Sequence, residues 1–126
     1  MMAKILIADD SESLRMELKE ILEKGGHEVI EAQDGYDGLM KAEGAEGVNF
    51  ILSDYNMPGL DGITMIAKIK EMERYRNVPV GMLTTESSKE LKAAGKDAGV
   101  VVWVVKPFEA ERLLMTVTKV LEKFPT

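Results

Sequence analysis

Short apolar runs alternate along this chain with longer stretches in which apolar residues recur at helical spacing. The five runs are Ile5–Ala8, Val29–Ile30, Phe50–Ser53, Val80–Leu83 and Val100–Val105. Central strands of a parallel sheet are unbroken apolar runs, because helices cover both faces of the sheet. The pattern therefore predicts five parallel strands.

The stretches between the runs predict five helices. In the first, apolar residues from Leu14 to Leu22 fall at i, i+4, i+7 and i+8 and stop before Gly25. The others are expected around Leu39–Gly44, Ile63–Met72, Ser87–Lys96 and Leu113–Leu121. Such strand–helix alternation predicts an α/β, doubly wound fold with right-handed crossovers. We expect one domain over residues 1–126, without an attached output domain.

Composition removes several classes of function. The chain has 126 residues, no cysteine and one histidine. It therefore has no disulfide framework, no Cys-based metal site and no multi-His metal site. The net charge is −6, and no basic stripe suggests a nucleic-acid partner. No apolar run is long enough for a secretion signal or a membrane span, so we expect a cytoplasmic protein with no membrane partner.

Polar residues follow four of the predicted strands. Asp9 and Asp10 follow the first, Asp54 the third, Thr84 the fourth and Lys106 the fifth. Ligands of open α/β sheets bind beyond the carboxyl ends of the strands. We therefore expect three carboxylates, one hydroxyl and one ammonium to converge there.

This set of groups suits phosphoryl transfer. Three adjacent carboxylates need a cation to stay ionised, and oxygen ligands with open water positions favour Mg²⁺ or Mn²⁺. Asp54 would be the nucleophile, giving an acyl phosphate. The metal and Lys106 would hold the charge on the phosphoryl oxygens.

Each of these residues also has a purely structural interpretation. Asp10 or Ser11 could cap the first helix, Asp54 could be a turn residue, and Thr84 could be a solvated hydroxyl or a helix cap. Lys106 before a proline is uninformative alone. Only the joint placement at one edge of the predicted sheet favours a reactive site.

Four motifs in order carry a resemblance to a known family. They are Ile7–Ser11, Ser53–Gly62, Leu83–Thr85 and Val105–Phe108. Their key residues are separated by about 44, 30 and 22 positions. Over roughly residues 3–122 the chain resembles the receiver domain of two-component response regulators, in the single-domain chemotaxis (CheY-like) style. The resemblance implies a flavodoxin-like sheet of order 2-1-3-4-5.

The resemblance also implies roles for the site residues. Asp54 is expected to be the phosphoacceptor, and Lys106 the cation on the phosphoryl oxygens. Asp9, Asp10, Asp54 and the backbone carbonyl of Asn56 are expected to bind the magnesium ion. The Lys106–Pro107 peptide is expected to be cis.

A two-state switch is implied as well. Thr84 would move to bond the phosphoryl group, and the aromatic residue Trp103 would follow it. Receivers more often have Tyr or Phe at this position, so the bulkier indole either hinders rotation or is a static anchor for a partner. Thr85, where Ala or Gly is usual, should crowd access to the phosphoryl group. Asn56 and Glu86 flank the site and are hypothesised to set the lifetime of the phosphorylated state.

Two residues of the predicted strands are unusual, one for a receiver domain and one for a strand. Val102 stands where many receivers have a small residue, and we expect it to narrow the groove between the fourth helix and the fifth strand. Gly81 lies inside a predicted strand, where glycine is destabilising and often marks a close approach.

The resemblance thus implies a phosphorylation-activated signalling switch of a two-component system and not an enzyme that turns over an external substrate. A sensor histidine kinase would phosphorylate Asp54. The output would be binding of a downstream protein, a flagellar motor switch or another effector, through the fourth helix, fifth strand and fifth helix (residues 87–121). We expect a monomer, with dimerisation on phosphorylation as the alternative.

Three other functions compete with this interpretation. A phosphatase or mutase of the haloacid dehalogenase kind also uses an aspartate nucleophile, but it normally has an aspartate where Asn56 stands, two residues later. A degenerate receiver would be an interaction module that never carries phosphate. A flavodoxin-like electron carrier would have a hydroxyl- and glycine-rich loop where Asp9 and Asp10 stand, and these carboxylates would repel a flavin phosphate.

Overall fold

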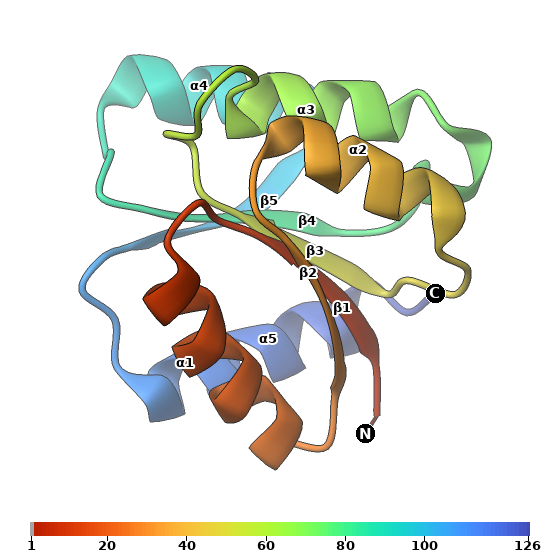
Figure 1. The fold of residues 1–126 in the computed structure, drawn as a ribbon, viewed down its shortest axis with the longest axis vertical. Coiled ribbons are helices and arrows are strands. Elements are labelled where there is room, and N and C mark those ends of the chain that lie inside the picture. Colours follow the sequence, from red (N-terminus) through yellow and green to blue (C-terminus); the bar gives the residue numbers. More distant parts are fainter. Residues whose placement is uncertain (1) are drawn as a thin grey trace.

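Strands and helices alternate along the chain in the computed structural model, which describes residues 2–126 (Figure 1). The strands are β1 (Lys4–Ala8), β2 (Glu28–Ala32), β3 (Phe50–Ser53), β4 (Val80–Thr84) and β5 (Val100–Val105). The helices are α1 (Glu12–Lys24), α2 (Gly35–Gly44), α3 (Gly62–Lys70), the 3-10 helix η1 (Glu73–Tyr75), α4 (Lys89–Ala98) and α5 (Ala110–Lys123). Within residues 2–126, no helix combines the length and apolarity that a membrane crossing requires.

All five strands are parallel and lie in the order β2-β1-β3-β4-β5. Helices α2, α3 and α4 cover one face of the sheet, and α1 and α5 cover the other (Figure 1). The doubly wound parallel sheet of order 2-1-3-4-5 expected from the sequence is confirmed. This strand order places the ends of β1 and β3 side by side at the middle of the sheet.

Two hydrophobic cores, one on each face, hold the sheet between its helices. Alternate residues of β1 supply both, with Leu6 in the core beneath α2 and α3 and Ile7 in the core beneath α1 and α5. Every residue of β3 and β4 is buried, whereas the edge strands β2 and β5 are half-exposed. The unbroken apolar runs therefore mark strands covered on both faces, as predicted.

Helix starts are fixed by side chains that accept a backbone hydrogen bond in the first turn. Ser11, Asp34, Asp61 and Ser88 cap α1, α2, α3 and α4 in this way. Asp10 takes no part in the cap of α1. This places Ser11 as the structural residue and leaves the Asp10 carboxylate, which is exposed, available for another role.

The start of β5 contains an irregularity that decides which side chains face α4. Val80 pairs with Val100, but the next residue of β4, Gly81, pairs with Val102, so Val101 is bulged out of register. As a result Trp103 packs with the α2–α4 core and Val102 with the α1/α5 core. Val102 also lines the groove beside α4 and the outer edge of β5, so the expectation that it narrows this groove stays a prediction.

The same register explains the glycine inside β4. A Cβ on Gly81 would lie 2.6 Å from Cγ1 of Val102 and 3.1 Å from the ring of Phe50. The neighbouring strand and the core thus occupy the space that a side chain would need. Gly81 permits the close approach of β5 to β4.

Candidate functional site

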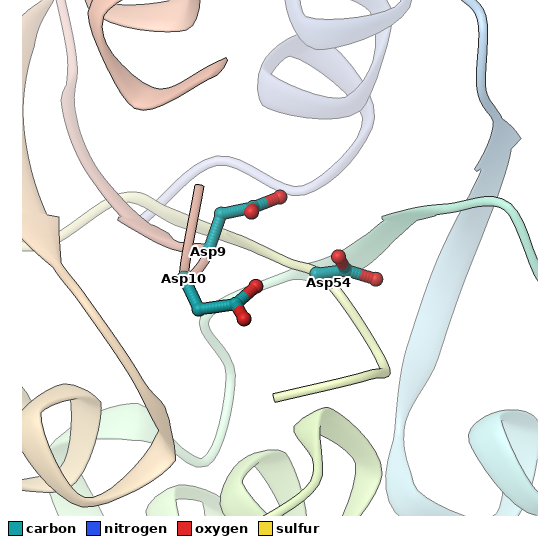
Figure 2. Close-up of side chains that lie close together, drawn as sticks. All are labelled: Asp9, Asp10 and Asp54. Carbon is teal, nitrogen blue, oxygen red and sulfur yellow. The ribbon is translucent and has the colours of Figure 1, made fainter. Parts of the chain in front are cut away.

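Three carboxylates gather where β1 and β3 end. Asp9 and Asp10 directly follow β1, and Asp54 directly follows β3. Their carboxylate oxygens come within 4.8 Å of one another, and Figure 2 shows the three side chains around a common space. Asp9 and Asp54 are buried whereas Asp10 is exposed, so the cluster opens to solvent on the Asp10 side.

Lys106 reaches this cluster from the end of β5. Its Nζ donates to Oδ2 of Asp9 and to Oδ2 of Asp54, both at 3.0 Å. Burial alone would lower the pKa of Lys106, but the bonds to the two carboxylates raise it above the ordinary value. Lys106 is therefore a fixed positive charge beside both buried carboxylates. The Lys106–Pro107 peptide is cis, as expected.

The Asp9 carboxylate is held by two donors. Its Oδ1 accepts from the Ser11 amide at 2.9 Å, and its Oδ2 accepts from Lys106. Burial raises the pKa of Asp9, although the Ser11 amide and Lys106 act in the opposite direction. The site therefore carries a carboxylate whose ionisation depends on nearby positive charge.

The donor set fits a divalent cation. Three carboxylates and one ammonium leave two negative charges, and all the available ligand atoms are oxygens. Hard cations such as Mg²⁺ prefer such ligands and keep several water molecules. The exposed Asp10 gives an ion access from solvent, so the acidic cluster has the composition and the opening that a magnesium site requires.

Thr84 lies at the end of β4 and is fully buried. Its Oγ1 accepts a hydrogen bond from the Glu86 amide at 3.3 Å. The structural interpretation of Thr84 as a solvated hydroxyl is therefore wrong. No hydrogen bond joins Thr84 to Asp54 within the described residues, although the two residues end adjacent strands of the sheet.

Glu86 links Asn56, beside the acidic cluster, to Trp103. Its carboxylate accepts from Nδ2 of Asn56 at 3.0 Å, and its main-chain oxygen accepts from Nε1 of Trp103 at 2.8 Å. The main-chain N–H of Asn56 in turn donates to Oδ1 of Asp54 at 3.3 Å. A chain of hydrogen bonds thus runs from Asp54 through Asn56 and Glu86 to the indole.

The indole of Trp103 lies against α4. A Cβ on Gly95, in the middle of that helix, would lie 2.9 Å from Cζ3 of the ring. Gly95 therefore provides the room that a ring as large as indole needs beside the helix.

Thr85, the residue expected to crowd the site, is exposed at the start of the β4–α4 loop.

Sequence reasoning missed one residue of the site. Nη1 of Arg15 donates to the main-chain oxygen of Asp9 at 2.6 Å, and its Nε lies 3.4 Å from Oε1 of Glu31. Arg15 follows the cap residue Ser11 by four positions, one helical turn, which lets its side chain reach back to the β1–α1 loop. That spacing was the only signal in the sequence.

Comparisons with known proteins agree with this geometry. Residues 5–118 match the family described as response regulator receiver domain. Chemotaxis protein CheY1 of Helicobacter pylori is 32% identical over 111 residues, 87% of this chain and 90% of the relative. A CheY homolog of Campylobacter jejuni is 33% identical, covering 87% of this chain and 85% of the relative.

Solved structures show the same similarity. The chemotaxis protein CheY4 of Vibrio cholerae superimposes with a TM-score of 0.91 at 42% identity, covering 96% of this chain and 100% of the other. A CheY-like receiver domain of Methanospirillum hungatei gives a TM-score of 0.91 at 28% identity, covering 98% of this chain and 96% of the other.

Proposed function

The chain belongs to the response regulator receiver domain family, and from this premise we propose that Asp54 accepts a phosphoryl group from the phosphohistidine of a sensor kinase. CheY-like receivers are signalling switches of two-component systems that interact with a histidine kinase and a downstream effector. The observation that carries the proposal is the position of Asp54, which shares the Lys106 ammonium with Asp9.

Receiver domains bind Mg²⁺ at an acidic pocket. In this chain the ion would be held by the side chains of Asp9, Asp10 and Asp54 and by the main-chain oxygen of Asn56. When bound, the ion supplies positive charge to the phosphoryl oxygens. Mn²⁺ would fit the same oxygen ligands.

The transfer step uses the residues of the chain as follows. An Asp54 carboxylate oxygen attacks phosphorus, and the P–N bond of the phosphohistidine breaks. The bonding electron pair leaves with the imidazole nitrogen, which takes up a proton, and an aspartyl phosphate is formed. Lys106 is already bonded to Asp54 and stabilises the charge on the phosphoryl oxygens. Hydrolysis later returns the carboxylate, so the chain is a switch with no external substrate.

The switch would act through the Glu86 backbone. Thr84 accepts from the amide of Glu86, and Trp103 donates to the carbonyl of the same residue. A Thr84 hydroxyl that turns to donate to a phosphoryl oxygen would move this peptide and the indole bonded to it. In this scheme Trp103 reports phosphorylation and is not a static anchor.

The lifetime of the aspartyl phosphate would be set by the side chains around the mouth. Asn56 bonds to Glu86 through its side chain at 3.0 Å and to Asp54 through its main-chain N–H, and we expect this pair to control attack by water. Thr85 is exposed next to it. Replacing Asn56 or Glu86 with alanine should change the dephosphorylation rate measured by loss of the phosphorylated mass, and an unchanged rate in both variants would remove this assignment.

Output would come from binding a downstream protein through α4, β5 and α5 (residues 87–121). The surface includes the exposed side chains of Val101, Val105 and Met115, and Trp103 forms part of it. A flagellar motor switch or another effector would be the partner. The unphosphorylated chain would be a monomer.

The first experiment uses the single tryptophan. Fluorescence of Trp103 is followed while Mg²⁺ is added, and then a small phosphodonor or beryllofluoride. Wild type is compared with Asp54→Ala and Thr84→Ala, and intact mass is measured on the same samples. We expect a response to Mg²⁺, a donor response that Asp54→Ala abolishes, and a mass gain of one phosphoryl group in wild type.

The outcomes separate the parts of the proposal. A phosphorylated mass with silent fluorescence would keep Asp54 as phosphoacceptor and contradict the role of Trp103. A donor response that survives Thr84→Ala would contradict the path through the Glu86 backbone. No mass gain with any donor, including a phosphorylated kinase, would overturn the proposed function in favour of an interaction module that never carries phosphate.

A further inference from the structure

A groove of about 510 Å³ lies between α4, the outer edge of β5 and the end of α5. Its floor is formed by β5 residues from Val100 to Trp103, and three lysines line it: Lys92 and Lys96 from α4 and Lys123 from α5. We call it the β5-edge groove. It contains no acidic lining residue, so its walls carry charge of one sign.

Lys92, Lys96 and Lys123 are exposed and take part in none of the ion pairs formed within residues 2–126. Nζ of Lys123 lies 5.6 Å from the centroid of the Phe124 ring. The chain as a whole has a net charge of −6. A concentration of unpaired positive charge against an acidic background creates a local potential that attracts anionic partners.

The backbone of β5 is open on the same side. The Lys106 amide donates to the Thr84 carbonyl and so faces β4. Successive residues of a strand direct their peptide groups to opposite edges, so those of Val105 and Trp103 point away from β4. Among the described residues 2–126, β5 is the last strand of the sheet and has no neighbour beyond it. Such an edge offers a row of donors and acceptors to another extended chain.

We propose that the β5-edge groove binds an extended acidic segment of a partner protein, which pairs with the free edge of β5 while its carboxylates contact Lys92, Lys96 and Lys123. Addition of a strand to an exposed edge gives affinity through the main chain and specificity through side-chain pockets. The apolar floor would receive alternate residues of the segment, and the lysines would read the acidic ones.

A second copy of this chain fits the groove less well. If two β5 edges paired about a two-fold axis, three lysines of each copy would face those of the other, and like charges in contact are unfavourable. The groove on the opposite side, between α1 and α5, is lined by Glu17, Glu20 and Glu111 with Lys24. A head-to-tail contact between the two grooves is therefore the competing arrangement that a test must detect.

This inference rests on the proposed function in one respect, since it names the chemistry of the partner that the switch would bind. Trp103 lines the groove and donates to the Glu86 carbonyl, so movement of the β4–α4 loop would reshape one wall. The groove itself is present without phosphorylation. A binding test on the unphosphorylated chain can therefore fail or succeed independently of phosphoryl transfer to Asp54.

The test follows backbone amides of the full chain by two-dimensional NMR. The probe is a blocked peptide of alternating valine and glutamate that spans the six residues of β5. We expect shifts in β5, in the second half of α4 and at the Trp103 indole N–H. A valine–lysine peptide of equal length should leave them unchanged. Methylation of alternate peptide nitrogens in the valine–glutamate probe should remove binding, because it blocks strand pairing.

Variants of the chain test the lysines. The double variant Lys92→Glu/Lys96→Glu should weaken binding of the valine–glutamate peptide at least about tenfold at low salt. The matched control Lys24→Glu/Lys68→Glu makes the same change in net charge away from the groove and should retain binding within about twofold. Circular dichroism of each variant establishes that it is folded.

Four results would overturn the proposal. They are no shifts in β5 at millimolar peptide, equal binding of the lysine peptide, equal binding of the methylated peptide, and equal loss of binding in the two double variants. Sedimentation of the free chain as a dimer or larger species through this groove would assign it to a second copy instead. Phosphorylation of Asp54 is measured separately by intact mass, so loss of one result leaves the other standing.

Discussion

Two half-buried lysines lie at opposite ends of the sheet, and their surroundings differ. Lys106, at the carboxyl ends of the strands, bonds to two carboxylates, which raise its pKa against the effect of burial. Lys70, at the end of α3 on the other side, donates to the main-chain oxygens of Val78 and of Arg76. Burial lowers the pKa of Lys70 because no opposite charge compensates it.

The two ends of the sheet therefore differ in kind. We call the end around Lys70 the structural end and the end around Lys106 the reactive end. Around Lys70 polar side chains satisfy main-chain carbonyls. Lys70 donates to carbonyls of the α3–β4 connection, and the exposed Arg74 and the buried Tyr75 donate to the Ala42 carbonyl. Around Lys106 two buried carboxylates share one ammonium, and the cluster is open to solvent through Asp10. Interactions of the first kind should determine stability, and those of the second kind should determine chemistry.

The largest effect should come from Lys106→Met. Loss of the ammonium removes charge stabilisation of the phosphoryl oxygens, and we expect phosphorylation by a small donor to slow about 10²–10³-fold. The same variant should bind Mg²⁺ more tightly, because the competing cation beside Asp9 and Asp54 is gone. Intact-mass time courses and Trp103 fluorescence titrations measure the two quantities. An unchanged phosphorylation rate would show that Lys106 has no role in phosphoryl transfer, and the proposed difference between the two lysines would be wrong.

Gly62→Ala should show how closely the reactive end depends on packing. A Cβ on Gly62 would lie 2.0 Å from the main-chain oxygen of Asp54, so the start of α3 or the strand end must shift. We expect a loss of about 3 kcal/mol in the free energy of unfolding. In the control Gly44→Ala nothing lies within 4 Å of the new Cβ, and a gain of up to about 1 kcal/mol is expected. Equal unfolding midpoints for the two variants would contradict the tight fit.

The sequence predicted the bounds of β3 and of the edge strand β5 residue for residue, but not those of the other edge strand, β2. β3 matched its apolar run residue for residue, because both faces are buried. β2 was visible only as Val29–Ile30, since its flanking residues are partly solvated. The bulge at Val101 was invisible, because a run of valines has no alternation to show which side chain faces which helix. α3 ends at Lys70, before the expected Met72, and η1 follows it.

Much of the candidate site could be read from the sequence for a topological reason. Parallel strands bring their carboxyl ends to one edge of the sheet. The sequence alone was therefore enough to group Asp9, Asp10, Asp54 and Lys106. Contacts made through the main chain could not be predicted. The bonds from Arg15 to the Asp9 oxygen and from Trp103 to the Glu86 oxygen depend on backbone positions, which any residue type supplies.

The variant Lys70→Met tests whether Lys70 contributes to stability and not to phosphorylation. The carbonyls of Val78 and Arg76 lose their charged donor, and we expect unfolding to become easier by about 1–3 kcal/mol. Phosphorylation of Asp54 should proceed at the wild-type rate, the opposite pattern to Lys106→Met. Lys68→Met is the control, because Lys68 is exposed on the same helix and should change stability little. Denaturant midpoints and mass time courses measure both properties. A slower phosphorylation in Lys70→Met would show that the two ends are coupled.

The smallest effect should be a pH dependence at the structural end. His27 is buried, and its Nδ1 accepts a hydrogen bond from the Ala3 amide at 3.1 Å. Burial lowers the pKa of His27 below 6.5, so near that pH the unfolded chain binds more protons than the folded one. The stability that His27 contributes is therefore present above about pH 6.5 and is lost as the pH falls below it. His27→Asn keeps an acceptor for Ala3 without titrating, so its unfolding midpoint should fall less between pH 7 and pH 5 than that of wild type. Parallel pH profiles of the two proteins would mean that His27 binds its proton equally in both states, and the acid sensitivity of the fold would then have to come from the carboxylates at the reactive end.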